Sequence, residues 1–231
     1  MPNILSRPPA TGLQHPRCYL REMRDCSPQI SKEHFISRDV LEVLGDMVAV
    51  DGAAWLPRGE QRDVGINSLS AHLLCERHNS ALSPLDQGAG LLFARLLQIH
   101  ADLKRRSLSR KGRVLLTNGE ALERWMLKAA VGYFFSRHAG GQDGAVLADD
   151  HEIDMRLVQR ALFAGDWQPG CGLYIQGLGA TFNTAGAVSI ASLMSTSQKI
   201  VVGARLIIAG LRFELLFDNR DAAVDGRKGR V

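Results

Sequence analysis

The sequence predicts an α+β protein in which a zinc-stapled N-terminal unit is followed by helices and then by a C-terminal antiparallel β-rich region. Cysteine and histidine occur in two short pairs near the N-terminus, and apolar segments with helix-capping residues follow. Glycine, threonine, serine and β-branched residues then dominate 171–218. Apolar positions three and four residues apart indicate helices, whereas β-branched runs between glycines indicate strands.

The composition excludes several classes of protein. The chain has 231 residues, of which 45% are hydrophobic and 23% charged, and this is typical of a globular protein rather than a disordered or fibrous one. Arg205, Arg212 and Glu214 interrupt the apolar run 200–217, so we expect no membrane span and no membrane partner. The N-terminus lacks the apolar segment of a signal peptide, so we expect a cytoplasmic protein with reduced cysteines.

The first elements are marked by turn and cap residues. Residues 1–17 carry three prolines and no hydrophobic period, which predicts an irregular arm. The segment 37–44 begins with a serine cap and is followed by glycine, which predicts a short helix. Asp51-Gly52 lies between apolar flanks within 47–56, and this dipeptide is typical of a β-hairpin.

Three longer helices and a set of strands are predicted after this hairpin. Ser83 and Pro84 match the cap and the first position of a helix, so we expect a long helix to begin there. The pattern predicts a second, mostly buried helix over 118–138 and a third over 150–163. The remaining segment, 171–218, is expected to form several antiparallel strands.

The best place to divide the chain is a basic stretch at 104–113. It contains cations and no acid, which is typical of a solvated linker and is also suited to phosphate contacts. The candidate nucleic-acid-binding residues there are Lys104, Arg105, Arg106, Arg110 and Lys111. The predicted units are an irregular arm (1–17), a zinc-binding domain (18–103), the basic linker (104–113), an α+β C-terminal domain (114–219) and a flexible tail (220–231).

Two short pairs of residues have the chemistry of a structural zinc site. Cys18 and Cys26 form the first pair, and Cys75 and His78 form the second. Zinc takes four such ligands in a tetrahedron, so we expect one structural Zn²⁺ held by all four. The alternative is that the cysteines are small buried side chains and that His78 is a surface residue.

With Glu33-His34 and Asn79 added, the pattern over 18–86 resembles the HNH family of metal-dependent nucleases. It is most similar to the zinc-stapled members of that family, which have a treble-clef, ββα-metal core. Glu33-His34 looks like the acid–histidine dipeptide of the family. Asn79, directly after His78, looks like its final metal ligand on the helix. The resemblance therefore implies a second, catalytic cation next to the structural zinc.

The residue types in this second site suit phosphodiester hydrolysis. A neutral imidazole can accept a proton from water at physiological pH, so His34 is the candidate general base. A carboxylate and an amide oxygen suit a hard divalent cation, so Glu33 and Asn79 are expected to hold Mg²⁺ or Mn²⁺. Taken singly, Glu33-His34 is also compatible with a solvated approach to a helix, and Asn79 with a turn or cap residue.

The sequence therefore favours a metal-dependent HNH-type endonuclease that hydrolyses phosphodiester bonds in DNA. The basic stretch would contact phosphates, and the C-terminal domain would select the target or contact a protein partner. The alternative is a catalytically inactive zinc-binding module for nucleic-acid or protein recognition. A third possibility, a small-molecule enzyme centred on 114–218, offers no identifiable catalytic group.

Overall fold

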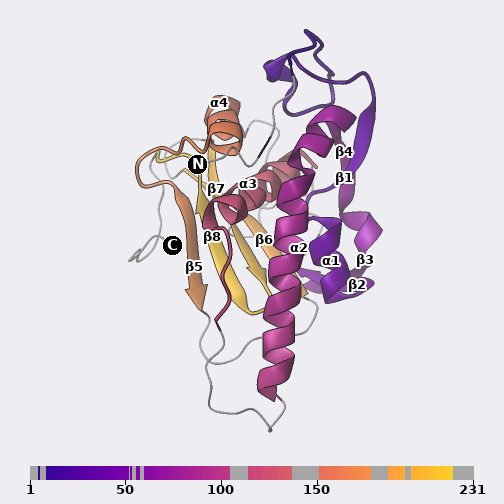
Figure 1. Cartoon of the computed structure of the whole chain (residues 1–231), viewed down its shortest axis with the longest axis vertical. Helices are drawn as coiled ribbons and strands as arrows, with labels where there is room; N and C mark the ends of the chain where they lie inside the picture. The colour runs from indigo at the N-terminus through magenta and orange to yellow at the C-terminus, as the bar shows by residue number, and fades with distance from the viewer. Residues whose placement is uncertain are drawn as a thin grey trace.

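The computed structural model describes residues 5, 9–51, 53, 56–57, 60–104, 114–136, 151–177, 187–195 and 199–220. These residues form an α+β fold with one mixed six-stranded sheet and one two-stranded sheet (Figure 1). The strands are β1 (Ile30–His34), β2 (Met47–Asp51), β3 (Gln61–Gly65), β4 (Ser70–Cys75), β5 (Gly172–Gly177), β6 (Ala187–Met194), β7 (Val201–Ile208) and β8 (Leu211–Leu216). The helices are α1 (Arg38–Leu44), α2 (Glu76–Lys104), α3 (Gly119–Phe135) and α4 (Met155–Gln159), with short helical turns η1 (Arg21–Met23), η2 (Ile66–Leu69) and η3 (Arg160–Ala164).

The predicted C-terminal β-rich region is confirmed. It supplies β5 to β8 of the large sheet, whose strand order is β3-β2-β6-β7-β8-β5. The pairs β5–β8, β6–β7 and β7–β8 are antiparallel. Ala209 and Gly210 connect β7 to β8 with φ values of 50° and 74°. Two successive positive φ values are typical of the tight hairpin turn that matches the twist of paired strands.

The two units predicted on either side of 104–113 share one sheet and one core. β2 pairs in parallel with β6, with Ala49 opposite Ala187 and Asp51 opposite Ser189. Buried residues from both units belong to one continuous hydrophobic cluster. The basic stretch therefore separates the units in sequence but not in packing. Its residues 105–113 lie outside the described part of the chain, as do residues 221–231 of the predicted tail.

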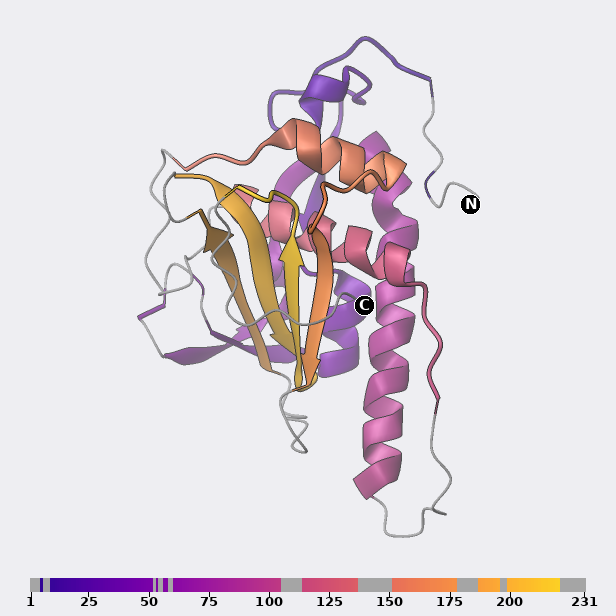
Figure 2. The same cartoon turned by 90° about the vertical axis from the view of Figure 1, so that its left-hand side faces the viewer.

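Helix α3 is the central buried element, as predicted. It begins after Asn118, whose side chain accepts a hydrogen bond of 3.1 Å from the Ala121 amide. The helix lies between α2 and the six-stranded sheet (Figure 2). The Phe93 ring of α2 contacts Trp125 of α3 at 5.6 Å and Phe213 of β8 at 5.8 Å between ring centroids. Because α3 has neighbours on both sides, most of its surface is buried, polar residues included.

The prediction that the long helix begins at Ser83-Pro84 is wrong, because α2 begins at Glu76. Pro84 lies inside the helix and has no N–H to donate to the carbonyl of Ser80. The Ser83 hydroxyl donates a hydrogen bond of 3.0 Å to that carbonyl instead. The Ser83 hydroxyl thus replaces the missing donor and helps the helix to continue past the proline. The observed helix has about two turns before the predicted start.

The hairpin and the third helix differ in extent from their predictions. β2 pairs with Gln61–Gly65, so the partner strand lies beyond 47–56. Gly52 of the predicted turn lies outside the described residues, and the described part of the connection contains amide–carbonyl bonds from Leu56 to Ala53 at 2.9 Å and from Glu60 to Pro57 at 3.0 Å. The third helix begins at Met155 and not near 150, since the Asp154 carboxylate caps its first amides.

Candidate functional site

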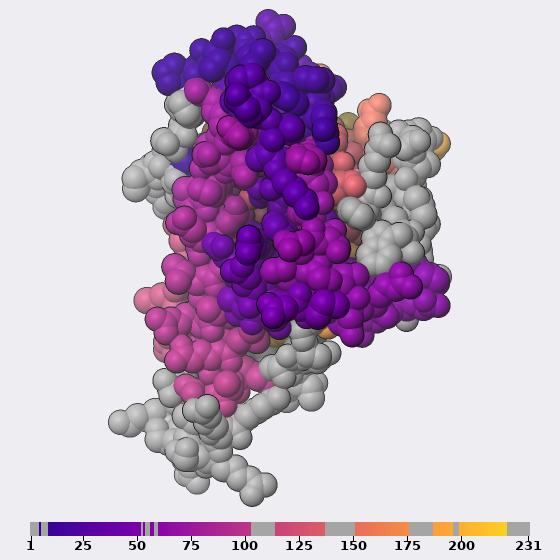
Figure 3. All heavy atoms as spheres, turned by 90° about the vertical axis from the view of Figure 1, so that its right-hand side faces the viewer, coloured from indigo at the N-terminus to yellow at the C-terminus, as the bar shows by residue number. Residues whose placement is uncertain are grey.

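The four predicted metal ligands converge at the N-terminal end of α2. Cys75 ends β4 and His78 lies in the first turn of α2, while Cys18 and Cys26 lie on either side of η1. Their ligand atoms all lie within 4.8 Å of one another, and all four residues are buried. In Figure 3 the N-terminal segment that carries the first pair forms one end of the molecule, against α2. We call these four residues the Cys3His cluster.

The spacing of the ligand atoms suits one tetrahedral ion. The distances from His78 Nδ1 to the sulfurs of Cys18, Cys26 and Cys75 are 3.3, 3.8 and 3.2 Å. Metal–sulfur bonds of about 2.3 Å and metal–nitrogen bonds of about 2.0 Å place tetrahedral S and N atoms about 3.5 Å apart. The Cys3His cluster can therefore hold a metal ion that contacts all four residues with little rearrangement.

The protonation chemistry of the cysteines also suits a metal. Burial raises the pKa of Cys18 and of Cys26, and negative charge on Cys75 adds to the effect. Burial alone would also raise the pKa of Cys75, but hydrogen bonds to its sulfur from the amides of His78 at 3.5 Å and Ser27 at 3.4 Å lower it. Three thiolates packed together need a cation to balance their charge, and a bound metal ion supplies it.

A carboxylate that the sequence did not reveal completes the cluster. Asp25 Oδ1 lies 2.7 Å from His78 Nε2, and the two side chains are each 3% exposed. This bond fixes the tautomer that leaves Nδ1 free for a metal, as carboxylates commonly do for metal-binding histidines. The only sequence signal was the position of Asp25 directly before Cys26.

Glu33, His34 and Asn79 line a second site. β1 and β4 are antiparallel, with Glu33 opposite Ala71 and His34 opposite Ser70, and α2 follows β4 directly. This register places the start of β1 opposite the residue from which α2 begins, and α2 contacts both strands, so that its residue Asn79 reaches the end of β1. The three side chains share one pocket of about 240 Å³, here called the Glu33 pocket. The structure thus brings together the three residues that the sequence assigned to one site.

Two residues of this site were not found from the sequence. The Lys128 ammonium of α3 donates hydrogen bonds to Glu33 Oε1 and to Asp86 Oδ2. Asp86 Oδ1 accepts a bond from the Ser37 hydroxyl, which in turn accepts one of 2.6 Å from Trp125 Nε1. Asp86 lies two helical turns after Asn79, a spacing that places both on one face of α2. A lysine among the apolar residues 125–131 of α3 was the available signal, because a buried ammonium needs a carboxylate partner.

The environment of the Glu33 pocket raises the pKa of the acid and lowers the pKa of the base. Burial raises the pKa of Glu33, while the charge of Lys128 and hydrogen bonds from Lys128 and Asn79 act against this rise. Burial lowers the pKa of His34, and the charges of Arg38 and Lys32 lower it further. His34 Nε2 is buried and has no hydrogen-bond partner within the described part of the chain. A neutral imidazole of this kind can accept a proton.

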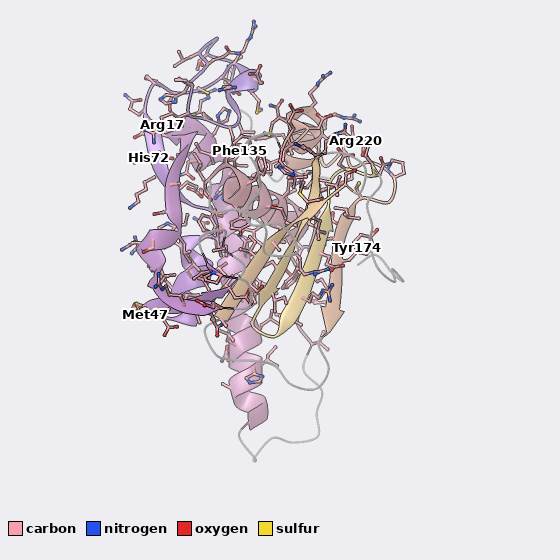
Figure 4. The ribbon with its side chains drawn as sticks, turned by 180° about the vertical axis from the view of Figure 1, so that it is seen from behind. Arg17, Met47, His72, Phe135, Tyr174 and Arg220 are labelled. Atoms are coloured by element: carbon pink, nitrogen blue, oxygen red, sulfur yellow. The ribbon has the colours of Figure 1, made fainter. Side chains whose placement is uncertain are left out.

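A larger pocket lies elsewhere on the molecule. It has a volume of about 470 Å³ and is lined by Arg17, His72 and Phe135, among others (Figure 4). The Phe135 ring stacks on Tyr19, with 5.6 Å between centroids and 13° between planes. Glu33, His34 and Asn79 do not line this pocket.

The candidate nucleic-acid contacts of the basic stretch lie almost entirely outside the described residues. Lys104 is the last residue of α2, while Arg105, Arg106, Arg110 and Lys111 lie outside the described residues.

No protein-family model, curated protein or solved structure matches the chain. Among the described residues, no helix is both long and apolar enough to cross a membrane.

Proposed function

We propose that the protein is a metal-dependent endonuclease of the HNH type that hydrolyses phosphodiester bonds in DNA. The meeting of Glu33, His34 and Asn79 in one pocket carries this proposal. An acid, an imidazole and an amide are the groups that such hydrolysis needs around a divalent cation. The order β1–β4–α2, with the pocket between the end of β1 and α2, is the arrangement expected of a ββα-metal core.

Zinc is the ion proposed for the Cys3His cluster. Three thiolates and an imidazole form a closed set of four ligands, which is typical of structural and not of catalytic zinc. One ligand pair precedes β1, and the other spans the end of β4 and the first turn of α2. This distribution supports a treble clef, in which the metal joins an N-terminal loop to the start of the helix.

In the proposed reaction, the His34 imidazole accepts the proton of the attacking water. Glu33 and Asn79 are the residues that would hold Mg²⁺ or Mn²⁺ from β1 and α2. When bound, that cation supplies positive charge against the negative charge that grows on the phosphate and the leaving oxygen. The low pKa of His34 keeps its imidazole neutral, so that it is available as a base near neutral pH.

Plasmid nicking by the zinc-loaded protein tests the proposal. Wild type should convert supercoiled DNA to the nicked form with Mg²⁺ or Mn²⁺, and His34→Ala should be slower by about 10²–10⁴-fold. His72→Ala is the matched control, because His72 is exposed on β4 and lies outside the Glu33 pocket. Nicking by His34→Ala at the wild-type rate would reject the role of His34.

A recognition module without catalysis is the second candidate. It is favoured by Lys128, which already binds the carboxylate of Glu33 and so partly neutralises it without a divalent cation. Such a module needs only the Cys3His cluster to keep its fold. DNA binding by zinc-loaded wild type with no nicking in Mg²⁺ or in Mn²⁺ would select this candidate over the endonuclease.

A further inference from the structure

Lys128 is fixed between two acidic side chains that belong to different elements. Its side chain is 4% exposed, and its ammonium pairs with Glu33 of β1 and with Asp86 of α2, whose side chains are 10% and 16% exposed. Lys128 and Glu33 are 95 positions apart in sequence. An ammonium taken out of water is stable only where such partners replace its hydration, so these three groups hold one another in place.

Trp125 anchors the same helix face by a second contact. It lies one turn before Lys128 on α3, and its indole N–H donates to the Ser37 hydroxyl at 2.6 Å. Ser37 precedes α1 but makes no side-chain cap bond to that helix, and its hydroxyl donates to Asp86 instead. One chain of hydrogen bonds therefore ties β1, the start of α1 and α2 to α3. This chain of hydrogen bonds, together with the two ion pairs of Lys128, fixes the position of the Lys128 ammonium.

Glu33 is thus held by Lys128 on one side and faces the pocket with Asn79. Lys128 binds its Oε1, and Asn79 of α2 lines the same pocket. Asn79 Oδ1 is the atom that this side chain can offer to a cation, because its amide nitrogen only donates. Two carboxylates and one ammonium leave the group Glu33–Asp86–Lys128 with a net charge of about −1, which still attracts a divalent cation.

We propose that Lys128 is a positioning residue of the endonuclease site, which rests on the function proposed above. It fixes Glu33 by Oε1 so that Oε2 is presented to Mg²⁺ or Mn²⁺ beside Asn79. In the opposite role, the Lys128 ammonium competes with the divalent cation for Glu33 and must leave this carboxylate before the cation can bind. The two roles predict opposite effects on cation affinity when the ammonium is removed, so one measurement separates them.

The test compares Mn²⁺ binding and plasmid nicking in zinc-loaded proteins. Free Mn²⁺ is measured by electron paramagnetic resonance, and Glu33→Ala locates the bound ion. Lys128→Met alone leaves two carboxylates without their partner and is expected to lose stability. The main variant is therefore Lys128→Met/Asp86→Asn, which keeps the net charge near −1 and keeps an oxygen for Ser37. Lys199→Met, an exposed lysine on another loop, is the matched control.

We expect the double variant to bind Mn²⁺ about 10–100-fold more weakly than wild type, as is typical when a residue that orients a metal ligand is lost. Its nicking should recover as Mn²⁺ is raised, while Lys128→Arg and Lys199→Met should stay within a few-fold of wild type. Equal or tighter Mn²⁺ binding by the double variant would overturn the positioning role. Mn²⁺ binding without nicking in wild type would overturn the endonuclease alone, and no Glu33-dependent binding would overturn both.

Discussion

Asp25 and His78 form a buried pair in which Oδ1 and Nε2 are 2.7 Å apart. His78 therefore uses one ring nitrogen for the protein and presents the other to three cysteine sulfurs. This pair links the loop between the first two cysteines to the start of α2.

Removal of the Asp25 carboxylate should weaken the zinc site. We expect Asp25→Ala to lower zinc affinity by about 10–100-fold, because the imidazole loses the partner that fixes its tautomer. Asp25→Asn should have a smaller effect, since its amide oxygen still accepts from Nε2. Competition with a chromophoric chelator measures the affinity, and Asp63→Ala, an exposed residue on β3, is the control. Unchanged affinity in Asp25→Ala would show that the pair has no influence on the metal.

The two proposed cation ligands should respond to metal concentration, and the proposed base should not. Glu33→Ala and Asn79→Ala are expected to need more Mg²⁺ or Mn²⁺ for half-maximal nicking, because each loses one ligand oxygen. No cation concentration should restore His34→Ala, since a metal cannot replace the missing proton acceptor. The measurement is a nicking rate at a series of cation concentrations. Identical metal dependence of all three variants would argue against separate roles.

The Glu214 carboxylate should make a pH-dependent contribution to stability. Burial raises its pKa, but hydrogen bonds from Arg212 and Arg205 outweigh burial and lower the pKa below its usual 4.5. A lowered folded-state pKa adds stability above the unfolded-state pKa, and this is lost as pH falls through the folded value. Glu214→Gln should therefore lower the free energy of unfolding by about 1–3 kcal/mol at pH 7.

Urea unfolding at pH 7 and at pH 3 checks this prediction. The difference between Glu214→Gln and wild type should shrink at the lower pH, because below its usual pKa of 4.5 the carboxyl group of the unfolded chain takes up a proton. Glu60→Gln is the control, because Glu60 is exposed. A difference of the same size at both pH values would mean that the charge of Glu214 does not contribute.

The basic stretch should supply affinity for DNA that is independent of sequence. Replacement of Lys104, Arg105 and Arg106 by alanine is expected to weaken binding and to flatten its salt dependence. The slope of log affinity against log salt should fall by up to about 2.7, or 0.9 for each of three phosphate contacts. Binding titrations at several salt concentrations measure it. An unchanged slope would indicate that the stretch is only a linker.

Sequence patterns predicted those helices and strands that depend on residues close together in the sequence. The cap at Asn118 and the apolar period after it predicted α3, and the β-branched segment 171–218 predicted the strands around the Ala209-Gly210 turn. The predicted start of α2 was wrong, because the sequence around Pro84 does not distinguish a proline in the first turn of a helix from a proline inside a helix. The difference depends on whether a neighbour such as Ser83 can replace the lost donor.

The sequence by itself determined which four residues form the Cys3His cluster and which residue types line the Glu33 pocket. Thiol and imidazole side chains in short pairs predict a metal site wherever the chain brings them together. Only the tertiary structure decided which partners these side chains take. Lys128 reaches Glu33, and β2 reaches β6, across long stretches of chain, and such pairings arise from the packing of a whole core. No local pattern encodes them, because their energy depends on the burial that the completed fold creates.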